Sequence, residues 1–252
     1  MTDDADAHTK VRTLAGRRAI ISGGSTGIGR AIAVLLAAEG AKVFIAGTQQ
    51  EHLDAALART REVGEGEGMV IDLAEEENVA RFMDAGSAAL GGYDIAVPNA
   101  AVAAQGLADM GDAELRHAVS LNFTQYLLMA HRAAKDMGEG GDIVLIGSMS
   151  AYVLGPGSTV YAGIKSGIQG LSVALRRELG PKGIRVALVE PGLTGSDMQE
   201  PDTPPEKQRE LIAEEKMLRA EDIAVGVHFL LTQPRRTVIQ RLTISPRVQD
   251  EE

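Results

Sequence analysis

The sequence predicts an α/β fold, a single domain built on a doubly wound parallel sheet of about seven strands with helices on both faces. From Arg17 onward, short β-branched runs alternate with helical stretches rich in Ala, Leu, Glu and Arg. The runs show little polar alternation, which is typical of strands buried on both faces between helix layers. A glycine-rich turn follows the first run. This alternation predicts parallel strands joined by helical crossovers.

The predicted elements follow one another without a linker. The apolar runs predict strands at 19–22, 42–46, 69–72, 94–97, 142–147, 184–189 and 238–244. The segments between them predict helices near 28–39, 50–63, 75–90, 112–137, 159–180 and 220–231. We expect residues 1 to about 12 to be a loose tail and residues 13–252 to form the domain.

Bulk composition disfavours several classes of function. The formal net charge of −10 argues against a nucleic-acid partner, which needs a concentrated positive face. Cysteine is absent, so disulfides and thiolate nucleophiles are excluded. The five histidines, at 8, 52, 117, 131 and 228, show no ligand spacing, and we expect no required metal. No apolar run approaches the ~18 residues of a membrane span, and the acidic start is unlike a signal peptide, so we expect a cytoplasmic enzyme.

A glycine loop follows the first predicted strand and leads into a helix, in the run from Ser22 to Gly29. Gly23 can take the tight turn, Gly27 leaves backbone room for a pyrophosphate, and Gly29 lets the helix pack closely. The helix N-terminus supplies N–H donors and a partial positive charge. The spacing Gly-x-x-x-Gly-x-Gly differs from the usual dinucleotide fingerprint, and a purely structural turn is the alternative.

Tyr161 and Lys165 lie four residues apart, which on a helix puts a phenol and an ammonium side by side. The ammonium would favour the phenolate of a side chain whose ordinary pKa is near ~10. Ser148 lies thirteen residues before the tyrosine, and Ser150 is its rival. An isolated Tyr-x-x-x-Lys pair is usually helix-surface decoration, so the interpretation depends on the other motifs.

A lone amide, Asn122, interrupts the apolar stripe of the helix expected at 112–137. Burying an amide is costly unless its polar atoms find partners. A core Asn that bonds its own helix backbone would explain the residue structurally.

Taken in order, these motifs resemble the classical short-chain dehydrogenases/reductases, over about Ala15 to Arg247. The resemblance implies a Rossmann-like fold and an NAD(P)(H)-dependent oxidoreductase that transfers a hydride between nicotinamide and a small carbonyl or alcohol. It implies a tetrad in which Tyr161 is the general acid/base and Ser148 donates to the substrate oxygen. Lys165 would lower the pKa of the tyrosine and bind the nicotinamide ribose, and Asn122 would anchor a water.

The resemblance also implies a set of cofactor contacts. They are Gly23, Ser25, Thr26, Gly27, Ile28, Gly29, Thr48, Asp72, Leu73, Asn99, Ala100, Tyr161, Lys165, Pro191, Gly192 and Thr194. Asp72 could also cap the helix that follows it. The run Pro98-Asn-Ala-Ala101 departs from the family's Asn-Asn-Ala-Gly, since Pro98 lacks an N–H donor and Ala101 has less backbone freedom.

The choice between NADP(H) and NAD(H) should be made at the end of the second strand. Gly47 stands where an Asp would bond the ribose of NAD and repel a 2′-phosphate. Thr48 could donate to that phosphate, and Arg17 or Arg18 could approach it. We therefore favour NADP(H). The C-terminal run from Leu242 resembles a mostly NADP-linked branch that includes clavulanate-type and hydroxy-acid dehydrogenases.

The substrate is expected between two segments, the loop after the fifth strand and a lid at about 194–217. The predicted pocket residues are Met149, Ser150, Tyr152, Leu154 and Met198. Helices 112–137 and 159–180 pair with symmetry mates in the family, which implies a homotetramer, with a dimer as the alternative. A non-catalytic NAD(P)-binding sensor or scaffold protein of the same fold is the runner-up function.

Overall fold

The computed structural model describes residues 11–200 and 203–248. Seven parallel strands form one sheet in the order β3-β2-β1-β4-β5-β6-β7. The strands are β1 (Arg18–Ile21), β2 (Lys42–Gly47), β3 (Glu65–Val70), β4 (Ile95–Val97), β5 (Asp142–Ile146), β6 (Arg185–Pro191) and β7 (Arg241–Ile244). The strand order reverses between β1 and β4, and such a switch point opens a crevice at the carboxyl ends of the strands.

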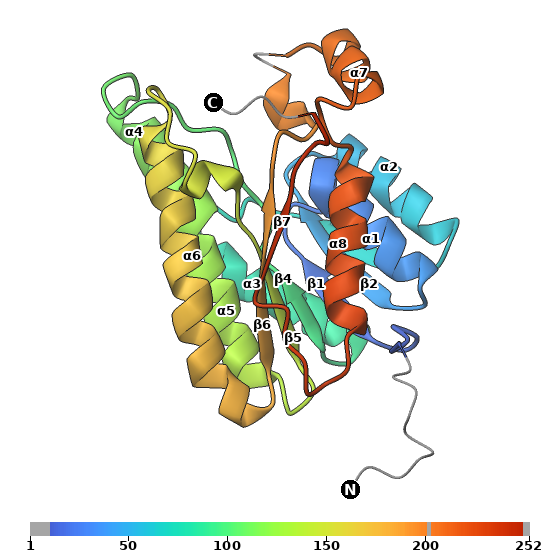
Figure 1. Ribbon diagram of the computed structural model, residues 1–252. Coiled ribbons are helices and arrows are strands. Elements are labelled where there is room, and N and C mark those ends of the chain that lie inside the picture. The colour runs from blue at the N-terminus through green and yellow to red at the C-terminus, as the bar shows by residue number, and fades with distance from the viewer. Residues whose placement is uncertain (1–10, 201–202, 249–252) are drawn as a thin grey trace, which may run out of the picture.

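Helices cover both faces of the sheet, as Figure 1 shows. They are α1 (Gly27–Ala38), α2 (Gln50–Arg61), α3 (Glu76–Leu90), α4 (Asp112–Val119), α5 (Gln125–Asp136), α6 (Thr159–Leu179), α7 (Pro205–Ala213) and α8 (Ala220–Thr232). One core packs α1, α2 and α8 against the sheet, and the other packs α3, α5 and α6. The two cores bury both faces of the central strands, which confirms the predicted doubly wound fold.

The third strand lies a few residues earlier in the chain than the sequence predicts. It spans Glu65–Val70, so the expected strand at 69–72 overlaps only its last residues. Gly66 and Gly68 weaken the apolar signal of this strand, yet they are required by close packing. A Cβ at Gly68 would lie 2.6 Å from the backbone oxygen of Ile45 on β2. The low β-propensity of the two glycines therefore argues against a strand here, although packing against β2 requires one.

The single helix expected at 112–137 is divided into α4 and α5 by a π-helical turn at Ser120–Thr124. The N–H of Gln125 donates to the oxygen of Ser120, a bond spanning five residues instead of four. The expected lid at 194–217 contains α7, which stands above the carboxyl ends of the strands in Figure 1.

The predicted tail falls mainly on residues 1–10, which lie outside the described residues. Arg12 is joined to the end of α8, because its N–H donates to the oxygen of Thr232 at 3.0 Å. Within 11–200 and 203–248, none of the helices has the length and apolar character needed to cross a membrane.

Candidate active site

A cleft of about 1150 Å³ lies at the carboxyl ends of the strands. It is lined by residues that are far apart in sequence: the glycine loop, the ends of β2, β4, β5 and β6, the first two turns of α6, and the segment that precedes α7. All the predicted cofactor contacts except Gly29 line it, as does Ser148. Most of the sequence-predicted site is therefore brought together in one cavity.

The glycine loop has the geometry of a cradle for a phosphate. Gly23 and Gly27 adopt φ values of +62° and +50°, which side chains disfavour. A Cβ at Gly29 would lie 2.1 Å from the backbone oxygen of Gly23, so only glycine lets α1 begin this close to the loop. The N-terminus of α1 faces the cleft, and N–H groups at a helix N-terminus bind phosphate. These residues fit the pyrophosphate of a dinucleotide.

Asn99 ties the glycine loop to the end of β4. Its side-chain amide donates to the oxygens of Ser22 and Gly23, at 2.9 and 3.1 Å. In return, the hydroxyl of Ser22 accepts the N–H groups of Asn99 and Ala100, at 2.8 and 3.0 Å. Pro98, which stands where the family has Asn, leaves this link in place, and its oxygen accepts the N–H of Ile146. Sequence reasoning had missed the role of Ser22.

The Tyr161–Lys165 pair lies on the first two turns of α6, against the end of β5. The Lys165 ammonium is buried and donates to the oxygen of Ile146 at 3.0 Å. Its nitrogen lies 5.4 Å from the centre of the Tyr161 ring and 5.3 Å from that of Tyr126. The Tyr126 hydroxyl donates to the same Ile146 oxygen at 3.0 Å. A lysine thus lies between two phenols, one of which faces the cleft.

Burial dominates the acidity of this pair. It raises the pKa of Tyr161 to about 12, and a hydrogen bond from Ser148 opposes that rise. It also lowers the pKa of Lys165 to about 7, because the desolvated ammonium has no carboxylate beside it. Burial therefore dominates the pKa of Tyr161 in the protein without cofactor, and its lowering by Lys165 stays a prediction.

Ser148 lies beside the tyrosine at the mouth of the cleft, where it caps a short 3-10 turn at Met149–Ala151. Its hydroxyl accepts the N–H of Ser150 at 3.1 Å and lies 3.1 Å from the Ser150 hydroxyl. The sequence offers the two serines as alternatives for one role, whereas in the structure their hydroxyl groups lie within hydrogen-bond distance of each other. Ser148 is the one that bonds Tyr161.

Asn122 is fully buried in the π-helical turn and does not line the cleft. Its amide oxygen accepts the N–H of Val102 and its amide nitrogen donates to the oxygen of Val102, both at 2.8 Å. This pairing contradicts the alternative of an Asn that bonds its own helix. Asn122 instead holds the loop after β4, whose residues form one wall of the cleft.

Among the residues that the structure describes, those lining the cleft at the end of β2 supply hydroxyl groups and no cation. Ser25, Gly47, Thr48 and Asp72 line the cleft there. A Cβ at Gly47 would lie 2.5 Å from the Ser25 hydroxyl oxygen, so an acidic side chain at 47 would displace that serine. Asp72 accepts the N–H of Ala74 at 2.9 Å and thereby caps the turn before α3, while the helix itself begins at Glu76.

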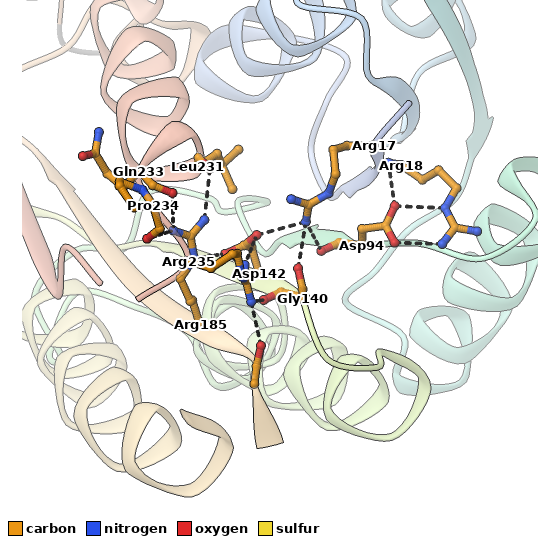
Figure 2. Close-up of polar contacts among 12 residues, drawn as sticks. Arg17, Arg18, Asp94, Gly140, Asp142, Arg185, Leu231, Gln233, Pro234 and Arg235 are labelled. Atoms are coloured by element: carbon orange, nitrogen blue, oxygen red, sulfur yellow. Dashed lines mark hydrogen bonds and ion pairs between the residues drawn. The ribbon is translucent and has the colours of Figure 1, made fainter. Parts of the chain in front are cut away.

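Arg17 and Arg18 lie at the opposite edge of the sheet, before and at the start of β1 (Figure 2). Arg17 donates to the Asp142 carboxylate at 2.9 Å, and Arg18 bonds both oxygens of the Asp94 carboxylate. The expectation that either arginine could approach a 2′-phosphate is therefore wrong. A strand of four residues separates the amino edge, where they lie, from the glycine loop.

The substrate end of the cleft differs in part from the expectation. Met149, Ser150 and Met198 line it, together with Val153. Tyr152 and Leu154 do not line it and are 44% and 70% exposed, which corrects their assignment to the pocket wall. The sequence had not indicated several other lining residues, because loops and a distant helix bring them in. These are Val102, Ala103, Ala104, His117 and Leu121, whereas Leu211 and Lys216, which also line the cleft, belong to the expected lid at 194–217.

Comparisons with known proteins agree with this geometry. A family model described as short chain dehydrogenase matches residues 17–207. A short chain dehydrogenase from Burkholderia cenocepacia J2315, solved in complex with NADP, is 34% identical with a TM-score of 0.83, covering 93% of this chain and 98% of that chain. A blue fluorescent protein from a metagenomic library, solved in complex with NADPH, is 28% identical with a TM-score of 0.82, covering 93% of this chain and 98% of that chain.

A 3-oxoacyl-(acyl-carrier-protein) reductase of Haemophilus influenzae is 31% identical over 220 residues, which cover 85% of this chain and 90% of the reductase. The matched stretch of the family model contains the glycine loop, the Asn122 turn and the Tyr161–Lys165 pair. The chain therefore belongs to the classical short-chain dehydrogenases/reductases, and is an oxidoreductase that uses a nicotinamide cofactor.

Proposed function

We propose that the protein reduces a small carbonyl compound, or oxidises the corresponding alcohol, with Tyr161 as the general acid/base. The observation that carries the proposal is the Tyr161 phenol, which faces the cleft beside the Ser148 hydroxyl and has the buried Lys165 nitrogen 5.4 Å from its ring centre. When bound, the nicotinamide supplies or accepts the hydride. The glycine loop and Asn99 would hold the dinucleotide, and Lys165 would bond its ribose.

In the reducing direction Tyr161 already has the protonation state that the reaction needs. With a pKa of about 12, Tyr161 is protonated at neutral pH and can give its proton to the oxygen of a carbonyl substrate as negative charge develops there. Ser148 donates a second hydrogen bond to that oxygen and stabilises the same charge. Met149, Val153 and Met198 form an apolar wall, which favours a compact, partly apolar substrate.

In the oxidising direction Tyr161 acts as the base, and its pKa must fall. A protonated Lys165 beside it, together with the positive charge of an oxidised nicotinamide, would favour the phenolate. Asn122 contributes at a distance, because it positions the loop after β4 that lines the cleft. Its role in anchoring a water of the proton relay stays a prediction.

We also propose that NADP(H) is preferred over NAD(H). Two observations support this preference: Gly47 presents no carboxylate to repel a 2′-phosphate, and the Ser25 and Thr48 hydroxyls line the same part of the cleft. The two solved relatives described above were complexed with NADP and NADPH.

The value of kcat/KM should therefore be higher with NADPH than with NADH. Thr48→Arg, which adds the missing cation, should increase the NADPH preference about tenfold; a wild type that favours NADH would contradict this proposal.

The segment 194–217 is proposed as a lid over the substrate. A Cβ at Gly27 would lie 3.3 Å from the Cβ of Ser196, so this segment reaches the glycine loop. Gln208 on α7 donates to the oxygens of Ser196 and Thr203, and these hydrogen bonds join α7 to the residues that precede it in the segment.

A homotetramer is proposed as the assembly, with a dimer as the alternative. The support is the set of large apolar side chains exposed around α4, α5 and α6, namely Val119, Leu127 and Val173. Sedimentation velocity should give a mass of four chains, and a monomer would contradict the proposal. The cytoplasmic location and the clavulanate-type branch stay predictions.

Turnover distinguishes the enzyme from the non-catalytic sensor or scaffold protein. We expect the wild type to oxidise NADPH in the presence of some members of a panel of small aldehydes, ketones and 3-oxo esters. Tyr161→Phe removes the transferable proton and should lower kcat at least ~10²-fold. Tyr152→Phe, which removes a phenolic hydroxyl outside the cleft, is the matched control and should retain activity. Unchanged turnover in Tyr161→Phe would contradict the assigned role.

A further inference from the structure

Three arginines bond one carboxylate at the amino edge of the sheet, opposite the cleft, and a fourth lies near it. Figure 2 shows the three, Arg17, Arg185 and Arg235, around Asp142. Asp142 is the first residue of β5 and its side chain is 4% exposed. Arg17, Arg185 and Arg235 all bond it, and Arg12 approaches closely enough to interact electrostatically with Asp142. We call these four residues the arginine cluster. It carries four positive charges against one negative charge, in a chain whose net charge is −10.

Three of the four guanidinium groups are well supplied with acceptors. Arg185 bonds Asp142 at 2.5 Å and also donates to main-chain oxygens at the end of α8, among them that of Leu231 at 3.0 Å. Arg235 bonds both Asp142 oxygens, at 3.1 and 3.0 Å, and the oxygens of two glycines. Arg17 adds the oxygens of Asp94 and Gly140.

Arg12 is different. Its Nη1 atom is buried and has no hydrogen-bond partner among the described residues. Burial and the like charges of Arg17 and Arg185 lower the pKa of this guanidinium, although it remains a cation at physiological pH. A buried guanidinium nitrogen without an acceptor costs free energy, and the excess of positive charge adds to that cost. Both costs would be removed by one group that carries negative charge and several oxygens.

We propose that the arginine cluster binds a small oxyanion of the phosphate class, held by Arg12 with Arg17 and Arg235 beside it. Arg17 and Arg235 side chains are 14% and 28% exposed, so solvent reaches the cluster. The planar guanidinium matches phosphate oxygens in pairs, and such charge-assisted bonds are stronger than neutral ones. Arg12 as a whole is partly exposed, and a phosphate there would give its guanidinium an acceptor while Asp142 keeps its bonds to the other three arginines. The site is separate from the dinucleotide cleft, which lies at the other edge of the sheet.

The test uses the full chain with saturating NADP⁺, so that inorganic phosphate cannot occupy the glycine loop. Thermal unfolding is measured in sodium phosphate and in sodium chloride of equal ionic strength, and phosphate affinity is measured by calorimetric titration. We expect phosphate to raise the unfolding temperature of the wild type saturably. Arg12→Ala should lose that rise and bind phosphate about tenfold more weakly or worse, as loss of one charge-assisted bond implies. Arg59→Ala, an exposed charge loss on α2, is the matched control and should behave as the wild type.

A phosphate response that is absent from the wild type, or that persists in Arg12→Ala, would overturn the proposal. Arg12→Gln provides a second variant if the alanine form does not fold, and direct titration of the wild type needs no variant. The acidic side chains of Asp3, Asp4 and Asp6 are the other candidate occupants. If they neutralise the cluster, the Asp3→Asn/Asp4→Asn/Asp6→Asn form will bind phosphate while the wild type will not, and the oxyanion proposal fails.

Discussion

At the scale of single residues, the acidity of Tyr161 is set by competition between burial and hydrogen bonding. The surrounding protein raises its pKa to about 12, and the Ser148 hydroxyl is the group that counteracts this effect. Spacing in the sequence predicted that phenol, ammonium and hydroxyl would meet. It could not predict their acidities, because burial depends on how helices and loops from the whole chain enclose the pair.

Ser148→Ala should therefore raise the pKa of Tyr161 further. In alcohol oxidation, where the phenolate is the base, kcat/KM of the variant should reach its plateau at a higher pH than that of the wild type. Ser148→Thr keeps the hydroxyl and serves as the control. Coincident pH profiles for Ser148→Ala and wild type would mean that the serine does not act on the acidity of the tyrosine.

Lys165 should make the free energy of unfolding depend on pH, in addition to its effect on activity. Burial lowers its pKa from 10.5 to about 7, so between those pH values the unfolded chain holds a proton that the folded chain has released. The free energy of unfolding should then rise with pH across that window through this group, while below pH 7 the cost of the buried ammonium is present in full. Lys165→Met lacks this amine, so its stability should not show this contribution to the pH dependence.

Urea unfolding of the cofactor-free proteins at pH 7 and pH 9 measures this effect. The stability of the wild type relative to Lys165→Met should increase between the two pH values, and both lie below the range in which Tyr161 titrates. A constant difference would show that the ammonium is not desolvated as the structure indicates.

At the scale of elements, periodicity predicted which segments are strands and helices, and it failed where contact overrides propensity. β3 was misplaced because Gly66 and Gly68 resemble a loop in the sequence, although β2 leaves room only for glycine at Gly68. The π-helical turn was not predicted because one residue changes the pattern of a helix by too little to detect. The position of Asn122 on the apolar stripe was nevertheless a correct indication of an unusual feature.

Asn122→Ala should destabilise the protein by about 2 kcal/mol or more, because the N–H and the oxygen of Val102 would both lose their partner. Chemical denaturation measures the change. Gln233→Ala, which removes an exposed bond to the oxygen of Phe229, is the control and should cost less than ~1 kcal/mol. Equal losses in the two variants would contradict the role given to Asn122.

At the scale of the whole molecule, the two edges of the sheet have different chemistry. The carboxyl edge holds the cleft, whose glycine loop, tyrosine and lysine carry recognisable sequence patterns. The amino edge holds the arginine cluster, which joins residues up to 223 positions apart, from Arg12 to Arg235, and leaves no local pattern. For that reason the sequence predicted most of the first edge and misassigned Arg17 and Arg18 of the second.

Asp142 links β5, β6 and the segment after α8, so its loss should affect the entire fold. Asp142→Asn would leave three bonded guanidinium groups without their shared charge and should cost about 3–5 kcal/mol, the range for breaking a buried ion pair. Asp112→Asn breaks an exposed pair with Arg116 and should cost less than ~1 kcal/mol. Urea denaturation of both variants checks this, and a loss below ~1 kcal/mol for Asp142→Asn would show that main-chain oxygens alone suffice for the cluster.

The central claim is that the Tyr161 phenol transfers the proton while the rest of the cleft holds the reactants. Single-turnover hydride transfer, measured with enzyme in excess over NADPH and a saturating carbonyl substrate, tests it most directly when the NADPH affinity of each form is measured in parallel. For Tyr161→Phe we predict a rate constant at least ~10²-fold lower with NADPH affinity within about threefold of the wild type. A single-turnover rate equal to that of the wild type would contradict the claim.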